Sequence, residues 1–564
     1  MLILKLMEFF IAHSWFYGLG IGALPLALNT DDQSKSVRTI FFGIAILSLA
    51  PVASILLAPS WADHLDVGLE YAVIDLILYP VAVVASLYSV WWFLRVGAHH
   101  WEVFMQRFKK RSALERNRRT DVREISKFLP QPIGQFDPLR YIDDERGIFV
   151  GLSEVYQPIF IPYEKWKKSH LLLSGQTGSG KGVAAQIILS QAIQRGEFCT
   201  LLDPKFDAWL PHVFKDACEK SGYPWCFLDL RQGAHPQINM FEGCDEETIE
   251  NMLIAAFSLA EKGDIADHHR IHDRRAALQV ARHCVAEVNA GRPCPTAADV
   301  YKQFGEAWEE TAPGFKGAME EMAELRSVNR ANGGIDINAM AQVGGMLYVV
   351  GDMGNTRIIR MQRMLLVRLM MLAKKRDYIT TTPRTITVFA DEFKAHISKP
   401  FMTGLGAARS WGMHCILAFQ SLQDLADTPA DLDKDVVRGA VMENCALSVS
   451  YQIKDPETAE WLARSTGNIL VDDESRKLKK NLAQSETFDD ERTVRLAERY
   501  YIDENMFMKL PEGCAVLSGA SELPVFCCTS RVEVQQNQAA ITPTVQPPTA
   551  VDVNEIALDD IPEI

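Results

Sequence analysis

Residues 175–182 read Gly-Gln-Thr-Gly-Ser-Gly-Lys-Gly, and they decide how the rest of this 564-residue chain is interpreted. An apolar run at 171–174 comes directly before them, and a helix-like segment at 183–189 comes directly after. A strand, a glycine-rich turn and a helix start in this order are typical of a phosphate-binding loop. Lys181 is then expected to reach the β- and γ-phosphates of a nucleotide. The alternative is an ordinary glycine-rich turn.

Eight residues make up the predicted nucleotide-binding loop: Gly175, Gln176, Thr177, Gly178, Ser179, Gly180, Lys181 and Gly182. The glycines let backbone N–H groups converge on an anion, and the helix N-terminus adds its partial positive charge. One position departs from the usual pattern, because Gly182 stands where Ser or Thr usually offers a hydroxyl to magnesium. Either water or the Thr177 hydroxyl is expected to take that place.

A second apolar run, Thr-Ile-Thr-Val-Phe-Ala at 385–390, ends in two carboxylates, Asp391 and Glu392. In phosphate-loop ATPases the first acid of such a pair holds Mg²⁺, usually through water, and the second polarises the attacking water. Acids are common at strand ends, so the pattern is informative only together with the loop at 175–182. The combination predicts ATP and Mg²⁺ as cofactors, Asp391 as the metal residue, and Lys181 and Glu392 as catalytic residues.

Two further polar residues flank the strand expected at 414–419. Gln420 follows this strand directly, and a polar side chain at a strand tip could sense the γ-phosphate. Arg409 lies near the end of the preceding helix-like segment. It is either a surface helix cap or an arginine finger that completes the site of a neighbouring subunit, which accelerates phosphoryl transfer by a factor on the order of 10³ or more.

Strand-like and helix-like segments alternate from residue 168 onward. The strand-like segments after the loop lie at 198–202, 225–230, 346–350, 385–390, 414–419 and 446–451. Such alternation predicts an α/β fold, a parallel sheet with helices on both faces. The alternation is lost between 246 and about 330, where the sequence is typical of helices separated by turns. An all-helical insertion within the α/β domain is therefore expected.

Two apolar runs near the N-terminus, at 39–58 and 71–94, are long enough to cross a bilayer as helices. A less clear run at 9–28 is compatible with a third span, an interfacial helix or an uncleaved signal-like segment. Asp75 in the second run is costly in lipid unless it faces protein or lies near the outer interface.

The charges beside these runs predict the topology. The loop between the two runs is acidic, with Asp63, Asp66 and Glu70. The segment after the second run is basic and contains Arg107, Lys109, Lys110, Arg111, Arg116, Arg118, Arg119 and Arg123. The positive-inside rule therefore places residues 95 onward in the cytosol. The basic run also suits anionic lipid headgroups, and a collar that meets DNA is the alternative.

The overall composition excludes some classes of site. A formal net charge of −14 argues against a surface that coats DNA generally, so nucleic-acid contact requires a local patch or a pore. The 11 cysteines form no CxxC pair and are interpreted as reduced thiols. His268 and His272 are four residues apart, but Arg270, Arg274 and Arg275 would repel a cation there. A solvated helix face is the preferred interpretation of this stretch.

The C-terminal segment contains neither Lys nor Arg after Arg531 and carries several acidic residues near its end. A segment of this composition cannot bury a core and is expected to be disordered. It is either a solubilising tail or a docking peptide that becomes ordered on a basic partner.

Together these residues resemble the type IV secretion coupling proteins of the TraG/TraD kind, membrane-anchored ATPases that hand DNA or protein to a conjugation or secretion channel. The resemblance covers almost the whole chain. It rests on the paired apolar runs, the loop ending in Gly-Lys-Gly, Asp203-Pro204-Lys205, the helical insertion, Asp391-Glu392, and Arg409 and Gly412 before Gln420. Two features depart from the family pattern: Phe206-Asp207-Ala208 replaces the more usual Gly-Glu after the lysine, and the possible third membrane helix is not typical.

The resemblance implies a RecA-like P-loop NTPase domain with an inserted all-α domain, and a hexamer around a central pore. It also implies that Gly182 is tolerated, that Arg409 is the arginine finger and that Gln420 links the nucleotide state to the pore. The predicted organisation is a transmembrane region at 1–95, a basic juxtamembrane segment at 96–150, a RecA-like domain at 151–245 and 340–531, an all-α domain at 246–339, and a disordered acidic tail at 532–564.

The function implied by the resemblance is ATP-driven delivery of DNA to a conjugation channel, from the bacterial inner membrane with the ATPase body in the cytoplasm. The expected partners are further copies of the chain, single-stranded DNA with a relaxase or other relaxosome proteins, and the channel components. The alternatives are a coupling protein for secreted protein effectors, an FtsK-like chromosome translocase, and a membrane scaffold that binds nucleotide without turnover.

Overall fold

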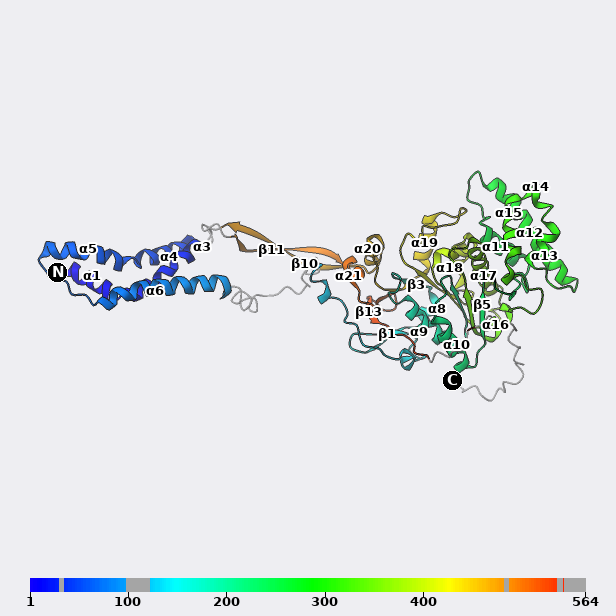
Figure 1. The fold of residues 1–564 in the computed structure, drawn as a ribbon, viewed down its shortest axis with the longest axis horizontal. Helices are drawn as coiled ribbons and strands as arrows, with labels where there is room; N and C mark the ends of the chain where they lie inside the picture. Colours follow the sequence, from blue (N-terminus) through cyan, green and yellow to red (C-terminus); the bar gives the residue numbers. More distant parts are fainter. Residues whose placement is uncertain (30–34, 98–121, 481–485, 535–540, 542–564) are drawn as a thin grey trace. The chain divides into compact units, whose positions relative to one another are not determined.

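The computed structural model describes residues 1–29, 35–97, 122–480, 486–534 and 541. Its chain forms two compact units, one of Met1–Arg118 with Ile469–Arg499, and one of Arg119–Asn468 with Tyr500–Ile564 (Figure 1). Of the predicted basic run, only Arg123 belongs to the described residues. Nearly all of the predicted acidic tail also lies outside them.

The first unit contains the apolar helices of the N-terminal region. Two continuous helical stretches, Lys35–Leu65 and Val73–Gly97, are long and apolar enough to cross a membrane. A bent pair, Leu2–Ala12 and Ser14–Asn29, meets the same test when it is counted as one span, with a bend of 62°. The helices are α1 (Leu2–Ala12), α2 (Ser14–Leu19), α3 (Ala23–Asn29), α4 (Lys35–Leu47), α5 (Ala50–Leu65) and α6 (Val73–Trp92).

Small residues let α2 and the turn after it pack closely against α6. A Cβ atom at Gly18 would lie 2.9 Å from the Ala82 Cβ atom, and one at Gly22 would lie 2.3 Å from the Ser86 hydroxyl oxygen. The Gly22 backbone N–H donates to the same Ser86 oxygen at 3.1 Å. Close helix contact at small residues is the usual way in which apolar helices associate in lipid.

The first unit also receives most of a two-stranded sheet from the C-terminal half of the chain, β10 (Asn468–Lys480) and β11 (Glu486–Tyr500). The sequence analysis does not predict these strands, because their many charged residues lack the β-branched and aromatic enrichment that marks a strand.

The second unit is built on an 11-stranded sheet with the order β2-β1-β13-β12-β9-β3-β8-β7-β4-β6-β5. The strands from β9 to β5 in this order run parallel to one another, as predicted. They are β9 (Leu447–Ser450), β3 (Leu171–Ser174), β8 (Met413–Phe419), β7 (Ile386–Ala390), β4 (Phe198–Asp203), β6 (Gly345–Val350) and β5 (Trp225–Asp229).

The predicted parallel sheet is extended at one edge by antiparallel strands that the sequence analysis does not predict. Beyond β9 the strands pair antiparallel: β12 (Cys514–Ser518), β13 (Val525–Cys528), β1 (Ile148–Leu152) and β2 (Pro158–Ile161). These strands are short, and β1 pairs with a strand from the other end of the unit, so local patterns in the sequence do not reveal them.

Helices cover both faces of the parallel part. On β3, Leu172 packs into one hydrophobic cluster, whereas Leu171 and Leu173 pack into the other, since neighbouring side chains of a strand point to opposite faces. The cluster that contains Leu171 and Leu173 also contains buried residues of α9 (Lys181–Gln194) and α10 (Leu210–Ser221). The cluster that contains Leu172 also contains buried residues of α17 (Thr356–Lys374) and α18 (Lys399–Ala408).

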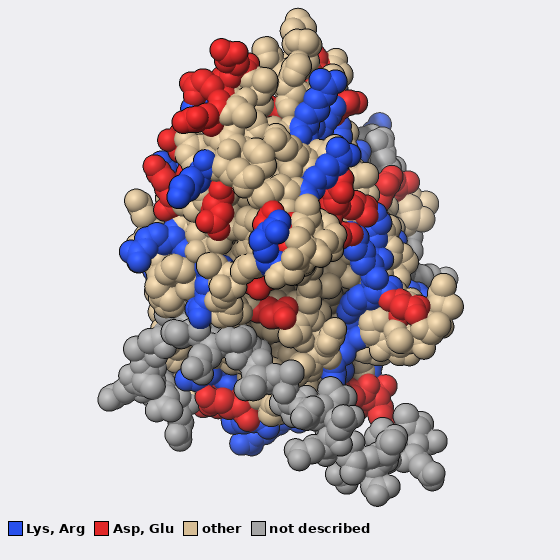
Figure 2. All heavy atoms as spheres, turned by 90° about the vertical axis from the view of Figure 1, so that its right-hand side faces the viewer, with Lys and Arg blue, Asp and Glu red and all other residues tan. Residues whose placement is uncertain are grey.

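The described chain between β5 and β6 is largely helical, where the insertion is predicted. Buried residues of α11 and α12 belong to the same cluster as α17, so the insertion shares its core with one face of the sheet. Figure 2 shows the end of the molecule that includes these helices, with acidic and basic side chains interspersed. The helices are α11 (Glu246–Phe257), α12 (Asp267–Asn289), α13 (Ala297–Phe304), α14 (Trp308–Thr311), α15 (Pro313–Glu324) and α16 (Ile337–Val343).

Candidate nucleotide site

The loop at 175–182 joins β3 to α9, as the sequence predicts. Gly178 and Gly180 have φ angles of 80° and 130°, which glycine adopts without strain. A Cβ atom at Gly180 would lie 2.5 Å from the ring of Tyr451, so the loop also needs glycine for close packing. Ser179 closes the turn, because its hydroxyl donates to the Gln176 carbonyl at 2.8 Å.

The Lys181 side chain is buried and folded back on its own loop. Its ammonium donates to the carbonyl oxygen of Gly175 and, at 3.2 Å, to that of Gln176. Burial lowers the pKa of Lys181, while the negative charges of Asp391 and Glu392 act in the opposite direction. The ammonium is therefore held in the concave side of the loop, beside the two predicted carboxylates.

The carboxyl end of β4 is organised around Asp203. Its side chain accepts hydrogen bonds from the backbone N–H groups of Lys205 at 3.0 Å, Phe206 at 2.9 Å and Asp207 at 2.7 Å. The buried Tyr348 hydroxyl donates to the same carboxylate at 2.5 Å. The pKa of Tyr348 is raised well above its ordinary value, mainly by burial and in addition by the negative charge of Asp203. Asp203 thus shapes the turn that presents Lys205 and Asp207.

Asp391 follows β7, the strand beside β4, and lines the same pocket as Lys181. Burial and the neighbouring Glu392 raise the pKa of Asp391 to about 6, against the opposing effect of Lys205 and Lys181. A buried carboxylate of this kind favours a bound cation, because a divalent ion stabilises its ionised form. Asp391 thus offers one carboxylate beside the phosphate loop, which suits Mg²⁺ because this ion is usually held by one or two carboxylates together with nucleotide phosphates. Among the residues that the structure describes, no cluster of three or more His, Cys, Asp or Glu is arranged to bind a metal ion.

Glu392 is 1% exposed and has a positive φ of 46°, which is uncommon for a residue other than glycine. Its Oε1 atom accepts a hydrogen bond from the Gln420 side-chain amide at 2.6 Å and forms an ion pair with Lys205. Gln420 also accepts a hydrogen bond from the Thr177 hydroxyl at 3.1 Å. A continuous chain of side chains thus connects the phosphate loop to the second carboxylate.

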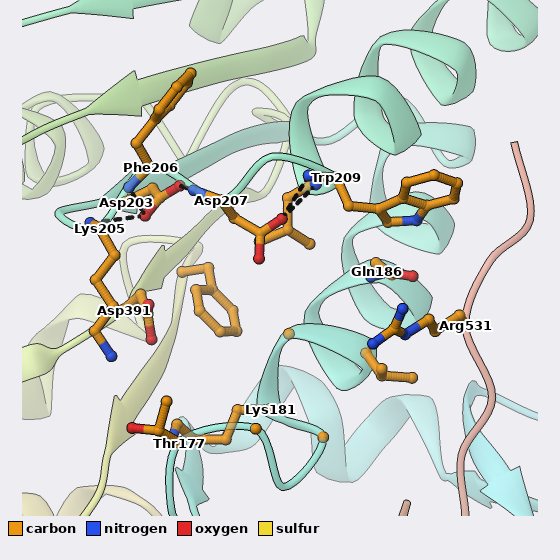
Figure 3. Close-up of a pocket in the computed structure, with 16 residues that line it drawn as sticks. Thr177, Lys181, Gln186, Asp203, Lys205, Phe206, Asp207, Trp209, Asp391 and Arg531 are labelled. Atoms are coloured by element: carbon orange, nitrogen blue, oxygen red, sulfur yellow. Dashed lines mark hydrogen bonds between the residues drawn. The ribbon is translucent and has the colours of Figure 1, made fainter. Parts of the chain in front are cut away.

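The residues converge on a pocket with a volume of about 420 Å³ (Figure 3). Thr177, Lys181, Lys205 and Asp391 lie toward one part of it. Volumes of this order suit small-molecule ligands.

A second part of the pocket is lined by residues that the sequence analysis misses. They are Gln186 on α9, Trp209 just before α10, and Arg531 after β13 (Figure 3). The Gln186 side chain accepts a hydrogen bond from the Val532 backbone N–H at 3.0 Å, which fixes the C-terminal segment beside α9. No local motif marks Arg531, because its place depends on the antiparallel edge of the sheet.

Glu392 and Gln420 do not line this pocket themselves and connect to it through Lys205 and Thr177, whereas Arg409 lies away from the site. Arg409 caps the C-terminus of α18 and precedes β8, whereas Gln420 follows β8. A strand of this length separates its ends by about 20 Å. The Arg409 guanidinium donates to the Lys168 backbone carbonyl, at the amino-terminal edge of the sheet. Within one chain, Arg409 and the phosphate loop thus lie at opposite edges.

The histidines of the stretch around residue 270 lie on α12 beside an arginine that forms ion pairs. The imidazole rings of His268 and His272 lie 5.3 Å apart on α12, and the intervening Arg270 pairs with Asp264 at 2.8 Å and Asp267 at 2.7 Å. All the cysteines are free thiols.

Comparison with known proteins connects this fold to conjugation. Residues 331–530 match the family model described as type IV secretory system conjugative DNA transfer. Mobilization protein A of Escherichia coli is 30% identical over 333 residues, which are 58% of this chain and 60% of the relative. The chain thus aligns with less than two thirds of the length of that curated relative.

Solved structures show the same fold. The bacterial conjugative coupling protein TrwBdeltaN70, in an unbound form, has a TM-score of 0.50 and 14% identity, over 73% of this chain and 96% of the other. The plasmid coupling protein TrwB in complex with ADP and Mg²⁺ has a TM-score of 0.50 and 14% identity, over 74% of this chain and 98% of the other. The predicted α/β fold is therefore confirmed, and the predicted resemblance to coupling proteins agrees with the family model and the curated relative.

Proposed function

We propose that this chain is a membrane-anchored P-loop ATPase of the type IV secretion coupling kind, which uses ATP hydrolysis to deliver DNA, as a nucleoprotein, to a conjugation channel. The observation that carries the proposal is the side-chain connection from Thr177 through Gln420 to Glu392, beside Lys181 and Asp391. The match of residues 331–530 to a conjugative DNA-transfer family supports the assignment of the cargo.

The proposed roles follow from these positions. The backbone of the loop at 175–182 binds the phosphates, and Lys181 leaves its loop carbonyls to contact the β- and γ-phosphates. Asp391 holds Mg²⁺ through water, and the ion would neutralise charge on the phosphate oxygens. Glu392 polarises the attacking water. Gln420, bonded to both Thr177 and Glu392, transmits the state of the phosphate site to the rest of the domain.

The position of Arg409 supports a homo-oligomer. Within its own chain it caps α18 and donates to the Lys168 carbonyl, far from the phosphate loop, so any catalytic role requires the site of a neighbouring subunit. We therefore assign it as an arginine finger supplied between subunits, most simply in a hexameric ring.

The apolar N-terminal helices support an anchor in the bacterial inner membrane, with the second unit in the cytoplasm. The proposed partners are single-stranded DNA with its relaxase, the components of the secretion channel, and a basic protein that docks the acidic tail.

ATP hydrolysis by the full chain in detergent, with and without single-stranded DNA, tests the proposal. We expect Lys181→Ala and Glu392→Gln each to lower the rate at least about 10²-fold, since each removes a group that acts on the transition state. We also expect DNA to stimulate the parent. Hydrolysis by either variant at the parental rate would show that the site is assigned wrongly. A parent that neither binds DNA nor responds to it would favour secreted proteins as the cargo.

A further inference from the structure

The turn after β4 carries a lysine with no role in the functions assigned above. Lys205 lines the nucleotide pocket, and its side chain is 38% exposed. Its ammonium forms an ion pair with Oε1 of Glu392, the buried carboxylate proposed to polarise water. Figure 3 shows the Lys205 side chain directed from the β4 turn toward Asp391, on the β7 side of the pocket.

The sheet topology builds this contact. β4 and β7 are neighbouring parallel strands, and the Asp391 backbone N–H donates to the Leu202 carbonyl at 3.1 Å. The two turns that follow these strands therefore meet at the same edge. Asp203 fixes the backbone of the β4 turn by accepting the Lys205 N–H at 3.0 Å. The lysine is thus held at its backbone by one carboxylate and at its ammonium by another.

The two oxygens of Glu392 have different environments. Oε1 receives both the Lys205 ammonium and the Gln420 amide. Oε2 is buried and has no hydrogen-bond donor among the residues that the structure describes. A buried acceptor without a donor is unfavourable, and water is the usual partner that satisfies it.

We propose that Lys205 is a positioning residue for ATP hydrolysis: with Gln420 it fixes the Glu392 carboxylate through Oε1 and leaves Oε2 to accept the attacking water. The inference rests on the proposed function, because it needs Glu392 to act on water. Two donors on one oxygen restrict rotation of the carboxylate, which matters because a misplacement of about 1 Å can reduce a rate about 10²-fold. Because both donors bind Oε1, neither of them occupies Oε2.

The test compares Lys205→Met with the parent in the full-length protein. We expect the maximal ATPase rate to fall about 10- to 100-fold, while the dissociation constant of a fluorescent ATP analogue changes less than about threefold. Lys205→Arg should recover part of the rate, because a guanidinium can still pair with the carboxylate. Lys220→Met is the matched control, since it removes an exposed lysine that pairs with Asp216 at 2.7 Å on α10.

A double-mutant cycle decides whether Lys205 acts through Glu392. In a Glu392→Gln background, Lys205→Met should cause no further loss of the residual rate. An additive loss would overturn the proposal and place Lys205 on the phosphates instead. A rate of Lys205→Met within twofold of the parent, or a loss explained by weaker nucleotide binding, would also overturn it. If Lys205→Met melts at a lower temperature than the parent, Lys205→Gln takes its place in every arm.

The same measurements separate this inference from the proposed function. Hydrolysis by the parent and its loss in Glu392→Gln alone report on the proposed function. The comparison of single and double variants reports on Lys205.

Discussion

Gly180 and Gly182 stand two residues apart in the phosphate loop, and the structure places different demands on them. Gly180 has a φ of 130° and leaves no room for a Cβ atom beside Tyr451. Gly182 is the second residue of α9, and a Cβ atom there would have no neighbour within 4 Å. The fold therefore requires glycine at position 180 but not at position 182, which is the position that departs from the usual motif.

We predict that Gly180→Ala strongly impairs the loop, because it combines backbone strain with a clash against Tyr451. The expected cost is about 1–3 kcal/mol of strain at such a backbone angle, together with at least about tenfold weaker nucleotide binding. Thermal melting and titration with a fluorescent ATP analogue measure the two effects. Gly182→Ala is the matched control and should melt within about 1 °C of the parent or slightly higher, because alanine is favoured in a helix. Equal behaviour of the two variants would contradict this account of the loop.

Gly182→Ser restores the hydroxyl that the usual motif carries, at a position with space for it. We predict an unchanged melting temperature and half-maximal ATP hydrolysis at a lower Mg²⁺ concentration, since the added oxygen is a further ligand for a hard cation. The measurement is the Mg²⁺ dependence of the rate at saturating ATP. An unchanged dependence would mean that water or Thr177 already fills that position equally well.

At the scale of the elements, the sequence predicts the parallel strands and misses the antiparallel ones. The strands predicted at 346–350, 385–390 and 414–419 agree with β6, β7 and β8 to within one residue. Each is a buried apolar run bounded by turns, so its pattern is local. β1 and β13, by contrast, are joined by pairing between distant parts of the chain, Leu152 with Cys528, and no local pattern encodes such a pair.

The residues of the candidate site also fall into a group that the sequence predicts and a group that it does not. The phosphate loop, Asp391, Glu392 and Gln420 follow parallel strands and could be predicted, because the carboxyl ends of parallel strands meet at one edge of the sheet. Arg531 and Trp209 could not, since Arg531 depends on the antiparallel edge and Trp209 on the path of an irregular turn. The ion pair between Lys205 and Glu392 could not be predicted either, because it depends on where the two side chains lie in space and not on their spacing in the sequence.

The packing of α6 against the turn after α2 makes a prediction at this scale. Gly22→Leu should destabilise the first unit, because its Cβ atom would lie 2.3 Å from the Ser86 hydroxyl oxygen. Overpacking of this kind typically costs about 1–3 kcal/mol. Melting of the full chain in detergent, followed by size-exclusion chromatography, measures the effect. Gly43→Leu on α4 is the control, since a Cβ atom there has no neighbour within 4 Å and the variant should behave as the parent.

At the scale of the whole molecule, the proposed role of Arg409 as a finger between subunits predicts that ATP hydrolysis depends on neighbouring copies of the chain. Arg409→Ala and Glu392→Gln chains should each be nearly inactive alone. A mixture of the two that exchanges subunits should recover activity, because some interfaces then combine an intact Glu392 with an intact Arg409. ATP hydrolysis as a function of the mixing ratio measures this recovery.

Arg140→Ala is the control for the mixing experiment, because it removes an exposed arginine that pairs with Asp137 at 3.2 Å. This variant should keep the parental rate alone and in every mixture. No recovery in mixtures of Arg409→Ala with Glu392→Gln, under conditions where the chains exchange, would show that Arg409 is a helix cap only.

The antiparallel edge of the sheet also sets an order of events during synthesis. β12 and β13 pair beside β9, the Gly513 N–H donates to the Ser179 carbonyl at 3.4 Å, and the Thr529 and Tyr451 hydroxyls lie 3.1 Å apart beneath the loop. A chain still on the ribosome lacks these supports until residues 513–529 have emerged. The phosphate loop is therefore translated early, but the contacts that support it are completed only when the last strands of the second unit have been made.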